Sequence, residues 1–344
     1  MPGQHIPVAS GPAAAGDALL AGGLVVLPTE TVYGLAGNAA NPAAVARIYE
    51  VKGRPTDHPV IVHVADAASA LRIDGGWARE VPDYARALAD SLWPGPMTLV
   101  LPRSARATDQ VTGGQDTVAL RVPGHPVARA VIAAMDAAAP GGAPHGVAAP
   151  SANRFGGVSP TTLGHALADI GDALDPARDL ALDGGPCDVG VESTIIDCTG
   201  STPRILRFGG ISAADVERVT GIVPELGGSI RVPGALASHY APRAVVVIAP
   251  DADAAAAYAD AAVETGLAPE RIALLAPADI PDIDGTSRLA APRSAEEYAH
   301  VLYAAFRGAD DRDVEFIIAV PPVKDGMGAA VIDRLRRASA PRPS

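Results

Sequence analysis

Beyond residue 243 the chain alternates short apolar runs with amphipathic helical stretches in a regular order. Strands that alternate with helices indicate βαβ units, and such units form a parallel sheet with helices on its faces. The expected elements are strands at 244–248, 271–275 and 314–319, and helices at 252–264, 295–307 and 329–337. Ser294, with Glu297 three residues later, predicts a capping box at the second helix. We therefore expect a small parallel α/β domain at 244–338 and a flexible tail at 339–344.

The first 220 residues give a less regular mixture of short strands and helices. Strands are predicted at 24–27, 59–64, 97–101, 117–122, 147–150, 180–182, 191–198 and 204–207. Helices are predicted at 17–21, 42–51, 82–92, 126–138, 161–167 and 212–219. Such short, frequently crossing strands favour a mixed, twisted sheet over a regular doubly wound one. The expected divisions are a flexible N-terminus at 1–15, a first domain at 16–220 and a Gly- and Pro-rich linker at 221–243.

Composition narrows the class of protein. At 344 residues the chain is too long for one ordinary core, so two domains are expected. No apolar stretch reaches the ~18 residues that a membrane span needs, and two cysteines, Cys187 and Cys198, form no disulfide framework, so the cytoplasm is expected. Residues 1–220 hold 15 basic against 22 acidic side chains, and residues 221–344 hold 12 against 17. Both parts are acidic, which argues against extensive nucleic-acid binding.

Polar side chains gather where the apolar strands of the first domain end. They are Thr29, Glu30, Thr31, Lys52, Arg54, His63, Thr117, Arg121, Ser151, Asn153, Glu192, Ser193, Thr194 and Arg207. Polar groups at strand ends are how open α/β sheets build sites, and cations with hydroxyl and amide donors suit phosphates and carboxylates. Each group alone has a structural alternative: Thr29–Thr31 as a solvated turn, Lys52 and Arg54 as a helix end, and His63 as a packed side chain.

Lys52 stands out because the chain has one other lysine, Lys324. A retained lysine indicates a need for a compact point charge, such as one against a phosphate. The familiar nucleotide signatures are missing: the sequence has no G-x-x-x-x-G-K-[ST] and no G-x-G-x-x-G after a strand. A nucleotide would therefore bind without a Walker loop or a dinucleotide fingerprint.

Taken together, the motifs resemble those of a known family. They are Pro28–Leu35, Lys52–Pro55, Trp93–Thr98, Arg121–Pro123, Ser151–Asn153 and Glu192–Thr194, in the order and spacing of the YrdC-like family. Ser238–Pro242, followed by a small α/β domain, resembles the two-domain form represented by the threonylcarbamoyl-AMP synthases. The resemblance covers about residues 10–340. It implies an N-terminal YrdC-like twisted mixed sheet with helices and a smaller C-terminal Rossmann-like parallel α/β domain.

The resemblance also implies a reaction, that of a nucleotidyltransferase. L-threonine, bicarbonate or CO2, and ATP would give threonylcarbamoyl-AMP and pyrophosphate, with Mg²⁺ on the phosphates. Partner proteins, the tRNA-modifying threonylcarbamoyl transferases, would then modify adenosine 37 of tRNA. Neither a membrane nor direct nucleic-acid binding is expected, and the protein is expected to be a monomer. The chemistry needs no covalent enzyme intermediate, so catalysis would rest on positioning and charge stabilisation.

Site residues follow from the matched motifs. Catalysis is assigned to Lys52 and Arg54. The resemblance places ATP against Lys52, Arg54, His58, Thr117, Ser151, Asn153, Ser159, Arg207 and Tyr240. It places L-threonine against Thr31, His63, Arg121, Ala149 and Ser193, with Arg121 at the carboxylate. His239 and Tyr240 would form a lid that excludes water from the labile adenylate.

Two positions depart from the family pattern. His58 stands where asparagine is common, and Phe155 replaces a small polar residue after Ser151–Asn153. Both departures concern the nucleotide contacts.

Three alternatives remain. The first is an RNA-binding or regulatory module of the same fold, which the acidic balance disfavours. The second is a carbamoyl-adenylate enzyme of hydrogenase maturation, whose zinc-finger segments two cysteines cannot build. The third places catalysis in the C-terminal domain, whose strand ends lack clustered cations.

Overall fold

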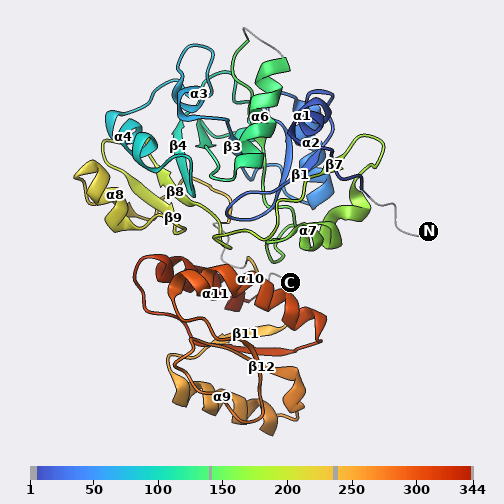
Figure 1. The fold of residues 1–344 in the computed structure, drawn as a ribbon. Coiled ribbons are helices and arrows are strands. Elements are labelled where there is room, and N and C mark those ends of the chain that lie inside the picture. Colours follow the sequence, from blue (N-terminus) through green and yellow to red (C-terminus); the bar gives the residue numbers. More distant parts are fainter. Residues whose placement is uncertain (1–5, 139–141, 235–238, 342–344) are drawn as a thin grey trace. The chain divides into compact units, whose positions relative to one another are not determined.

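The computed structural model describes residues 6–138, 142–234 and 239–341. The chain separates into two compact units (Figure 1). The first comprises Met1–Phe155, Pro160–Asp188 and Glu192–Ala235, and the second comprises Gly156–Ser159, Val189–Val191 and Leu236–Ser344. The predicted linker at 221–243 is therefore divided between the two units. In the described part of the chain no helix is long and apolar enough to cross a membrane.

The first unit is built on a mixed sheet. Its strands lie in the order β10-β9-β8-β4-β5-β3-β6-β2-β1-β7. Their bounds are β1 Val25–Leu27, β2 Gly34–Asn38, β3 Ile61–His63, β4 Met97–Pro102, β5 Thr117–Arg121, β6 Val147–Ala148, β7 Leu180–Ala181, β8 Thr194–Asp197, β9 Arg204–Arg207 and β10 Glu225–Leu226. The sheet contains both parallel pairs, such as β3 with β5, and antiparallel pairs, such as β4 with β5. This confirms the predicted mixed sheet.

Helices pack against this sheet and complete the core of the first unit. They are α1 Pro12–Leu20, α2 Pro42–Lys52, α3 Ala67–Leu71, α4 Asp83–Leu92, α5 Asp109–Thr112, α6 Pro126–Ala138, α7 Leu163–Ile170, the 3₁₀ turn Gly171–Ala173, and α8 Ala213–Thr220. Leu19 of α1 shares an apolar cluster with Val131 and Ile132 of α6 and with Leu27 of β1. The core thus relies on aliphatic side chains, in keeping with an aromatic content of 4%.

The described part of the expected flexible N-terminus, residues 6–15, makes contacts with the first unit. Ile6 is buried, and the backbone N–H of Ala9 donates to the carbonyl of Ala181 at 2.8 Å. Helix α1 begins at Pro12, five residues before the predicted start at 17. Proline at the first helical position is favourable because its missing N–H would have no partner there. Ala15 and Leu19 of this helix are fully buried, so packing against α6 holds it in place.

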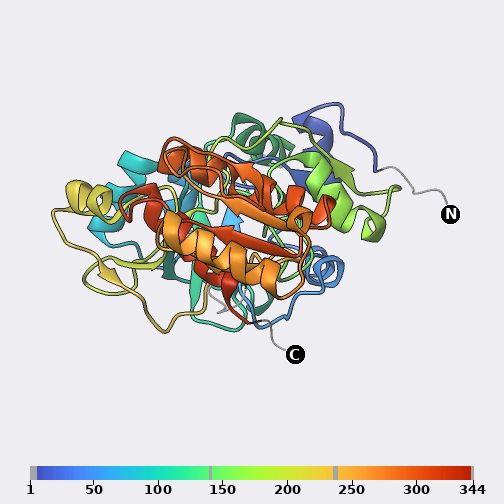
Figure 2. The same ribbon diagram turned by 90° about the horizontal axis from the view of Figure 1, so that it is seen from below.

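The second unit is a four-stranded parallel sheet in the order β11-β14-β12-β13. Its elements are β11 Val245–Ile248, α9 Ala252–Glu264, the 3₁₀ turn Pro269–Arg271, β12 Ile272–Leu275, β13 Ser287–Ala290, α10 Ala295–Asp311, β14 Phe316–Ala319 and α11 Met327–Ser339. Helix α9 covers one face, and α10 and α11 lie on the other; Figure 2 shows α9 in orange from below. The predicted parallel domain is confirmed, with β13 as an additional strand.

The predicted capping box at Ser294 forms in part. Its hydroxyl accepts from the backbone N–H of Glu297 at 3.1 Å, as expected. The Glu297 carboxylate accepts from the N–H of Arg293 at 2.8 Å, one residue before the helix cap. The start of α10 is thus fixed from both sides.

Candidate active site

Arg121 and His63 are neighbours at the ends of two parallel strands. The register of β3 against β5 pairs Ile61 with Ala119 and His63 with Arg121. Because side chains alternate between faces along a strand, Ile61 and His63 share one face with Ala119 and Arg121. Two side chains predicted to hold threonine therefore lie together on one side of the sheet.

The guanidinium of Arg121 is buried and held by three acceptors. Its Nη2 donates to Glu30 Oε1 at 2.7 Å, its Nη1 to Thr31 Oγ1 at 2.9 Å, and its Nε to the carbonyl of Gly95 at 3.3 Å. Burial alone raises the pKa of Glu30, but the charge of Arg121 and hydrogen bonds from Gly124 and Arg121 outweigh it and lower the pKa below its ordinary value. The pair is therefore ionised, and two of the five N–H groups of Arg121 have no acceptor within the described residues.

The turn before β2 positions Thr31. Thr29 Oγ1 donates to the carbonyl of Val32 at 2.6 Å and accepts from the N–H groups of Thr31 and Val32 at 3.2 Å. Hydroxyls that bond to nearby backbone stabilise turns in this way. Thr31 is fully buried, so the turn at Thr29–Thr31 is not the solvated turn that was the alternative reading.

His63 is buried and uncharged. Burial, followed by the neighbouring charge of Arg121, lowers its pKa to about 3. Its Nδ1 has no hydrogen-bond partner among the residues that the structure describes. A buried polar atom without a partner costs stability, and such atoms are found where a ligand or water completes the bond.

Ser193 and Arg207 form a second polar cluster beside the first. The parallel register of β4 and β8 sets Thr194 opposite Met97, and the Ser193 hydroxyl lies 2.7 Å from that of Thr98. Arg207 donates to the Ser193 carbonyl through Nε at 3.1 Å and through Nη2 at 2.9 Å, and to the Pro233 carbonyl through Nη1 at 2.8 Å. Arg207 thus joins the sheet to the middle of the predicted linker.

Residues 230–233 lie as a strap over the same face of the sheet. Val232 is buried in one apolar cluster with Ile61, Val100, Ala119 and Ile195. The side-chain amide of Gln115 accepts from the N–H of Arg231 at 2.9 Å. Since Ile61 and Ala119 share their face with His63 and Arg121, the strap covers the sheet next to the two polar clusters.

Lys52 occupies a buried slot at the end of α2. The helix is capped at its start by Asn41, whose side chain accepts from the N–H of Ala43. Gly53 follows its last residue, with a φ of 60° that is readily adopted only without a side chain. Lys52 Nζ donates to the carbonyls of Ser151 and Asn153, both at 2.5 Å. Burial, and then the charge of Arg54, lower its pKa well below the ordinary value. Its third N–H has no acceptor in the described chain.

Arg54, His58 and Phe155 form one cluster. Arg54 Nη2 donates to the carbonyl of Pro59 at 2.8 Å, and its guanidinium carbon lies 5.6 Å from the ring centre of Phe155. The rings of His58 and Phe155 meet edge to face at 5.4 Å. The two departures from the family pattern are therefore in contact with each other and with Arg54. Burial, then Arg54, lower the pKa of His58, so the imidazole is neutral at physiological pH.

The loop after β6 is fixed by backbone pairing on both sides. The N–H of Ala149 donates to the carbonyl of Ile61 at 3.1 Å, and Ser151 forms an isolated bridge with Gly34. Asn153 Nδ2 donates to the carbonyl of Arg154 at 2.7 Å. Ala149 thus pairs with the start of β3, while the carbonyls of Ser151 and Asn153 accept from Lys52.

Some predicted residues lie apart from this set. Thr117 begins β5 and Arg121 ends it, so about 13 Å of strand separates them. Ser159, His239 and Tyr240 belong to the second unit. There Tyr240 is buried, stacks on Tyr303 at 5.7 Å between ring centres, and has a φ of 61°. Ser238 of the same motif lies outside the described residues.

Glu30 was expected among the polar strand-end groups but was assigned no ligand, and Thr98 and the carbonyl of Pro233 were not part of the predicted site. Glu30 and Thr98 stand inside the motifs Pro28–Leu35 and Trp93–Thr98, which gave the signal. Their roles became visible only through contacts with Arg121 and Ser193, which are 91 and 95 positions away.

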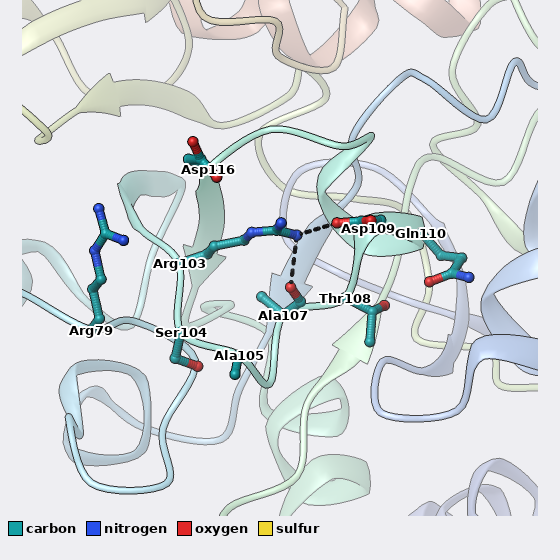
Figure 3. Close-up of a pocket in the computed structure, with 9 residues that line it drawn as sticks. All are labelled: Arg79, Arg103, Ser104, Ala105, Ala107, Thr108, Asp109, Gln110 and Asp116. Carbon is teal, nitrogen blue, oxygen red and sulfur yellow. Dashed lines mark hydrogen bonds and ion pairs between the residues drawn. The ribbon is translucent and has the colours of Figure 1, made fainter.

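A different pocket of the same unit, about 430 Å³ around the ion pair of Arg103 and Asp109, contains none of the predicted site residues (Figure 3).

Comparison with known proteins identifies the family of this chain. Residues 17–209 match a family model described as telomere recombination, and residues 211–340 match one described as threonylcarbamoyl-AMP synthase, C-terminal domain. The chain is 37% identical over 333 residues to threonylcarbamoyl-AMP synthase of Pyrococcus abyssi, covering 93% of this chain and 92% of the relative. The chain belongs to the two-domain threonylcarbamoyl-AMP synthase family.

Other members of the threonylcarbamoyl-AMP synthase family support the same assignment. The Bacillus subtilis enzyme is 37% identical over 329 residues, covering 93% of this chain and 90% of that one. A crystal structure of Pyrococcus abyssi Sua5 complexed with L-threonine superposes with a TM-score of 0.83 at 36% identity, covering 95% of this chain and 94% of the other. Family, fold and nucleotidyltransferase activity are thereby shown, and the predicted resemblance is confirmed.

Proposed function

We propose that the polar face of the first unit binds threonine and ATP side by side and joins them through CO2. The observation that carries this is Arg121: its guanidinium is buried, held by Glu30 and Thr31, and retains two N–H groups for a further acceptor. Two N–H groups of one guanidinium suit the two oxygens of a carboxylate. Threonine would bind there by its carboxylate, with Thr31, His63, Ala149 and Ser193 around it.

ATP would bind next to threonine, at the Lys52 slot. Lys52 Nζ uses two donors on the carbonyls of Ser151 and Asn153 and has no further acceptor among the described residues, and the charge of Arg54 is close enough to lower its pKa. Phosphate binding would restore the ammonium charge that burial disfavours.

The other predicted contacts of the nucleotide remain predictions: His58, Thr117, Ser151, Asn153, Ser159, Arg207 and Tyr240. The lid formed by His239 and Tyr240 also remains a prediction. Among the described residues no three His, Cys, Asp or Glu side chains gather as a metal site. Mg²⁺ would therefore enter with the phosphates of ATP as part of the substrate.

The reaction then proceeds in two steps. The amine of threonine attacks CO2 and loses a proton to water to give a carbamate. A carbamate oxygen attacks the α-phosphorus, and pyrophosphate leaves with the bonding electron pair. Nδ1 of His63, which has no partner among the described residues, would accept a hydrogen bond from threonine. Lys52 and Arg54 would stabilise the charge that develops on the phosphates.

The product would pass to a tRNA-modifying threonylcarbamoyl transferase. We propose the cytoplasm as the location of the enzyme.

The proposed reaction is tested by measuring pyrophosphate release from ATP by the full chain, with threonine and bicarbonate supplied or withheld. Release should require both co-substrates. Equal turnover with serine would contradict the threonine assignment, and turnover without bicarbonate would contradict the carbamate step.

A further inference from the structure

The second unit has a pocket of its own at the carboxyl edge of its parallel sheet. The pocket has a volume of about 770 Å³. Its walls come from the loops that follow all four strands: residues 250–251 after β11, 277–280 after β12, 292–294 after β13 and 320–325 after β14. Pockets of roughly 300–1,000 Å³ are typical of small-molecule sites.

The topology of the sheet favours a ligand at this place. β11 and β14 are neighbours, yet the chain leaves β11 for α9 on one face and leaves β14 for α11 on the opposite face (Figure 1). Diverging connections open a crevice beyond the strand ends, and open α/β sheets bind ligands at such a crevice. Part of the pocket lies at this point, between Asp251 and Val320.

The walls are built rigidly before any ligand binds. Arg288 Nη2 donates to the carbonyls of Ala276 at 3.1 Å and Pro277 at 2.9 Å, and its Nη1 donates to that of Ile280 at 3.2 Å. The hydroxyl of Tyr298, a lining residue, donates to the carbonyls of Leu275 and Val320. A preformed site loses less entropy when it binds a ligand.

The lining combines flat apolar groups with carboxylates. The apolar part includes Pro250, Pro277, Ile280, Pro292, Pro321 and Pro322. Three aspartates, Asp251, Asp279 and Asp325, face a single cation, Arg293. Asp251 and Ser294 already cap α9 and α10, so these helix ends are occupied by their own side chains. The excess of carboxylates favours ligands that donate hydrogen bonds and disfavours polyanions.

We propose that this pocket binds a nucleoside-like ligand, a planar ring carrying hydroxyl donors and at most one negative charge. The ring lies against the proline walls, the carboxylate of Asp279 accepts from the hydroxyls, and Arg293 accommodates a single anionic group. In the described part of the chain neither the side chain of Asp279 nor that of Arg293 has another partner. The pocket is independent of the nucleotide site proposed for the first unit, which is built for phosphates.

The test is a titration of the full chain with adenosine, followed at the Ile280 methyl resonance, a reporter inside the pocket. Adenosine should shift this resonance saturably, and ATP should do so about tenfold more weakly because its charge meets the aspartates. Ala278→Trp fills the pocket from an exposed wall position and should abolish the shift. Asp279→Asn should weaken binding about fivefold, the difference between a charged and a neutral acceptor.

Controls separate this site from the first unit. Asp284→Asn, an exposed carboxylate outside the lining, and Lys52→Ala should both leave the adenosine shift intact. Pyrophosphate release should remain unchanged in Ala278→Trp. The proposal is overturned if adenosine causes no saturable shift, if the shift survives Ala278→Trp, or if ATP binds there as tightly as adenosine.

Discussion

The polar face of the first unit and the pocket of the second unit handle charge in opposite ways. In the first, Glu30, Lys52 and Arg121 are buried and each is held by protein groups. In the second, Asp279 and Arg293 are exposed and have no side-chain partner within the described residues. Burying a charge is costly unless it is paired. In the first unit, a substitution that removes one of these charges therefore lowers the stability of the fold as well as changing the site. The second leaves its charges free for a ligand without involving the fold.

Lys52→Ala should give the largest effect. The variant removes the amino group that is held by the carbonyls of Ser151 and Asn153. Pyrophosphate release should fall by about 10²–10³-fold, the loss typical of removing a donor that stabilises charge in the transition state. Lys324→Ala is the matched control, because it removes the other lysine, an exposed one in the second unit. Similar losses in both variants would show that the effect is not specific to the slot.

Glu30→Gln should come next, since it leaves the buried guanidinium of Arg121 without its anion. The free energy of unfolding should fall by about 3 kcal/mol, the cost of breaking a buried ion pair. Threonine should stabilise this variant more than the wild type, because its carboxylate would supply the missing charge. Urea denaturation with and without threonine measures both effects. Glu50→Gln, at an exposed carboxylate, serves as the control, and equal stabilisation by threonine in variant and wild type would argue against a carboxylate at Arg121.

The sequence predicted the two sheets and most strands, but contacts between distant segments were beyond it. Strand β2 was missed because Gly34 and Gly37 interrupt its apolar pattern. Glycine is nevertheless needed at position 37, because a Cβ added there would lie 3.0 Å from the Ile48 side chain. Strand β13 was missed because a charged residue, Arg288, lies in its middle. In the structure the Arg288 side chain donates to the carbonyls of Ala276, Pro277 and Ile280 in the loop after β12. The motifs singled out Thr31, Lys52 and Arg121 as site residues, and the structure shows each of them hydrogen-bonded to a distant segment. Their partners, carbonyls and carboxylates from other segments, carry no local signal.

His63 should make stability depend on pH. Its pKa is about 3 in the folded protein and ordinarily 6.5, so the unfolded chain binds the proton more readily. The stabilisation from keeping His63 neutral is complete above pH 6.5 and is lost as pH falls towards 3. Between pH 7 and pH 5 the wild type should lose about 2 kcal/mol more than His63→Gln does. Urea denaturation at the two pH values checks this, and parallel losses would mean that His63 is protonated in the fold.

Asp279→Asn should have the smallest effect on the fold. The side chain is exposed and unpaired in the described chain, so the free energy of unfolding should change by less than about 0.5 kcal/mol. Set beside Glu30→Gln, this variant separates charges that the fold requires from charges that a ligand would use. A loss above about 1 kcal/mol in urea denaturation would show that the Asp279 carboxylate has a structural role. The pocket would then resemble the polar face of the first unit, and weaker adenosine binding in the variant would no longer identify Asp279 as a direct ligand contact.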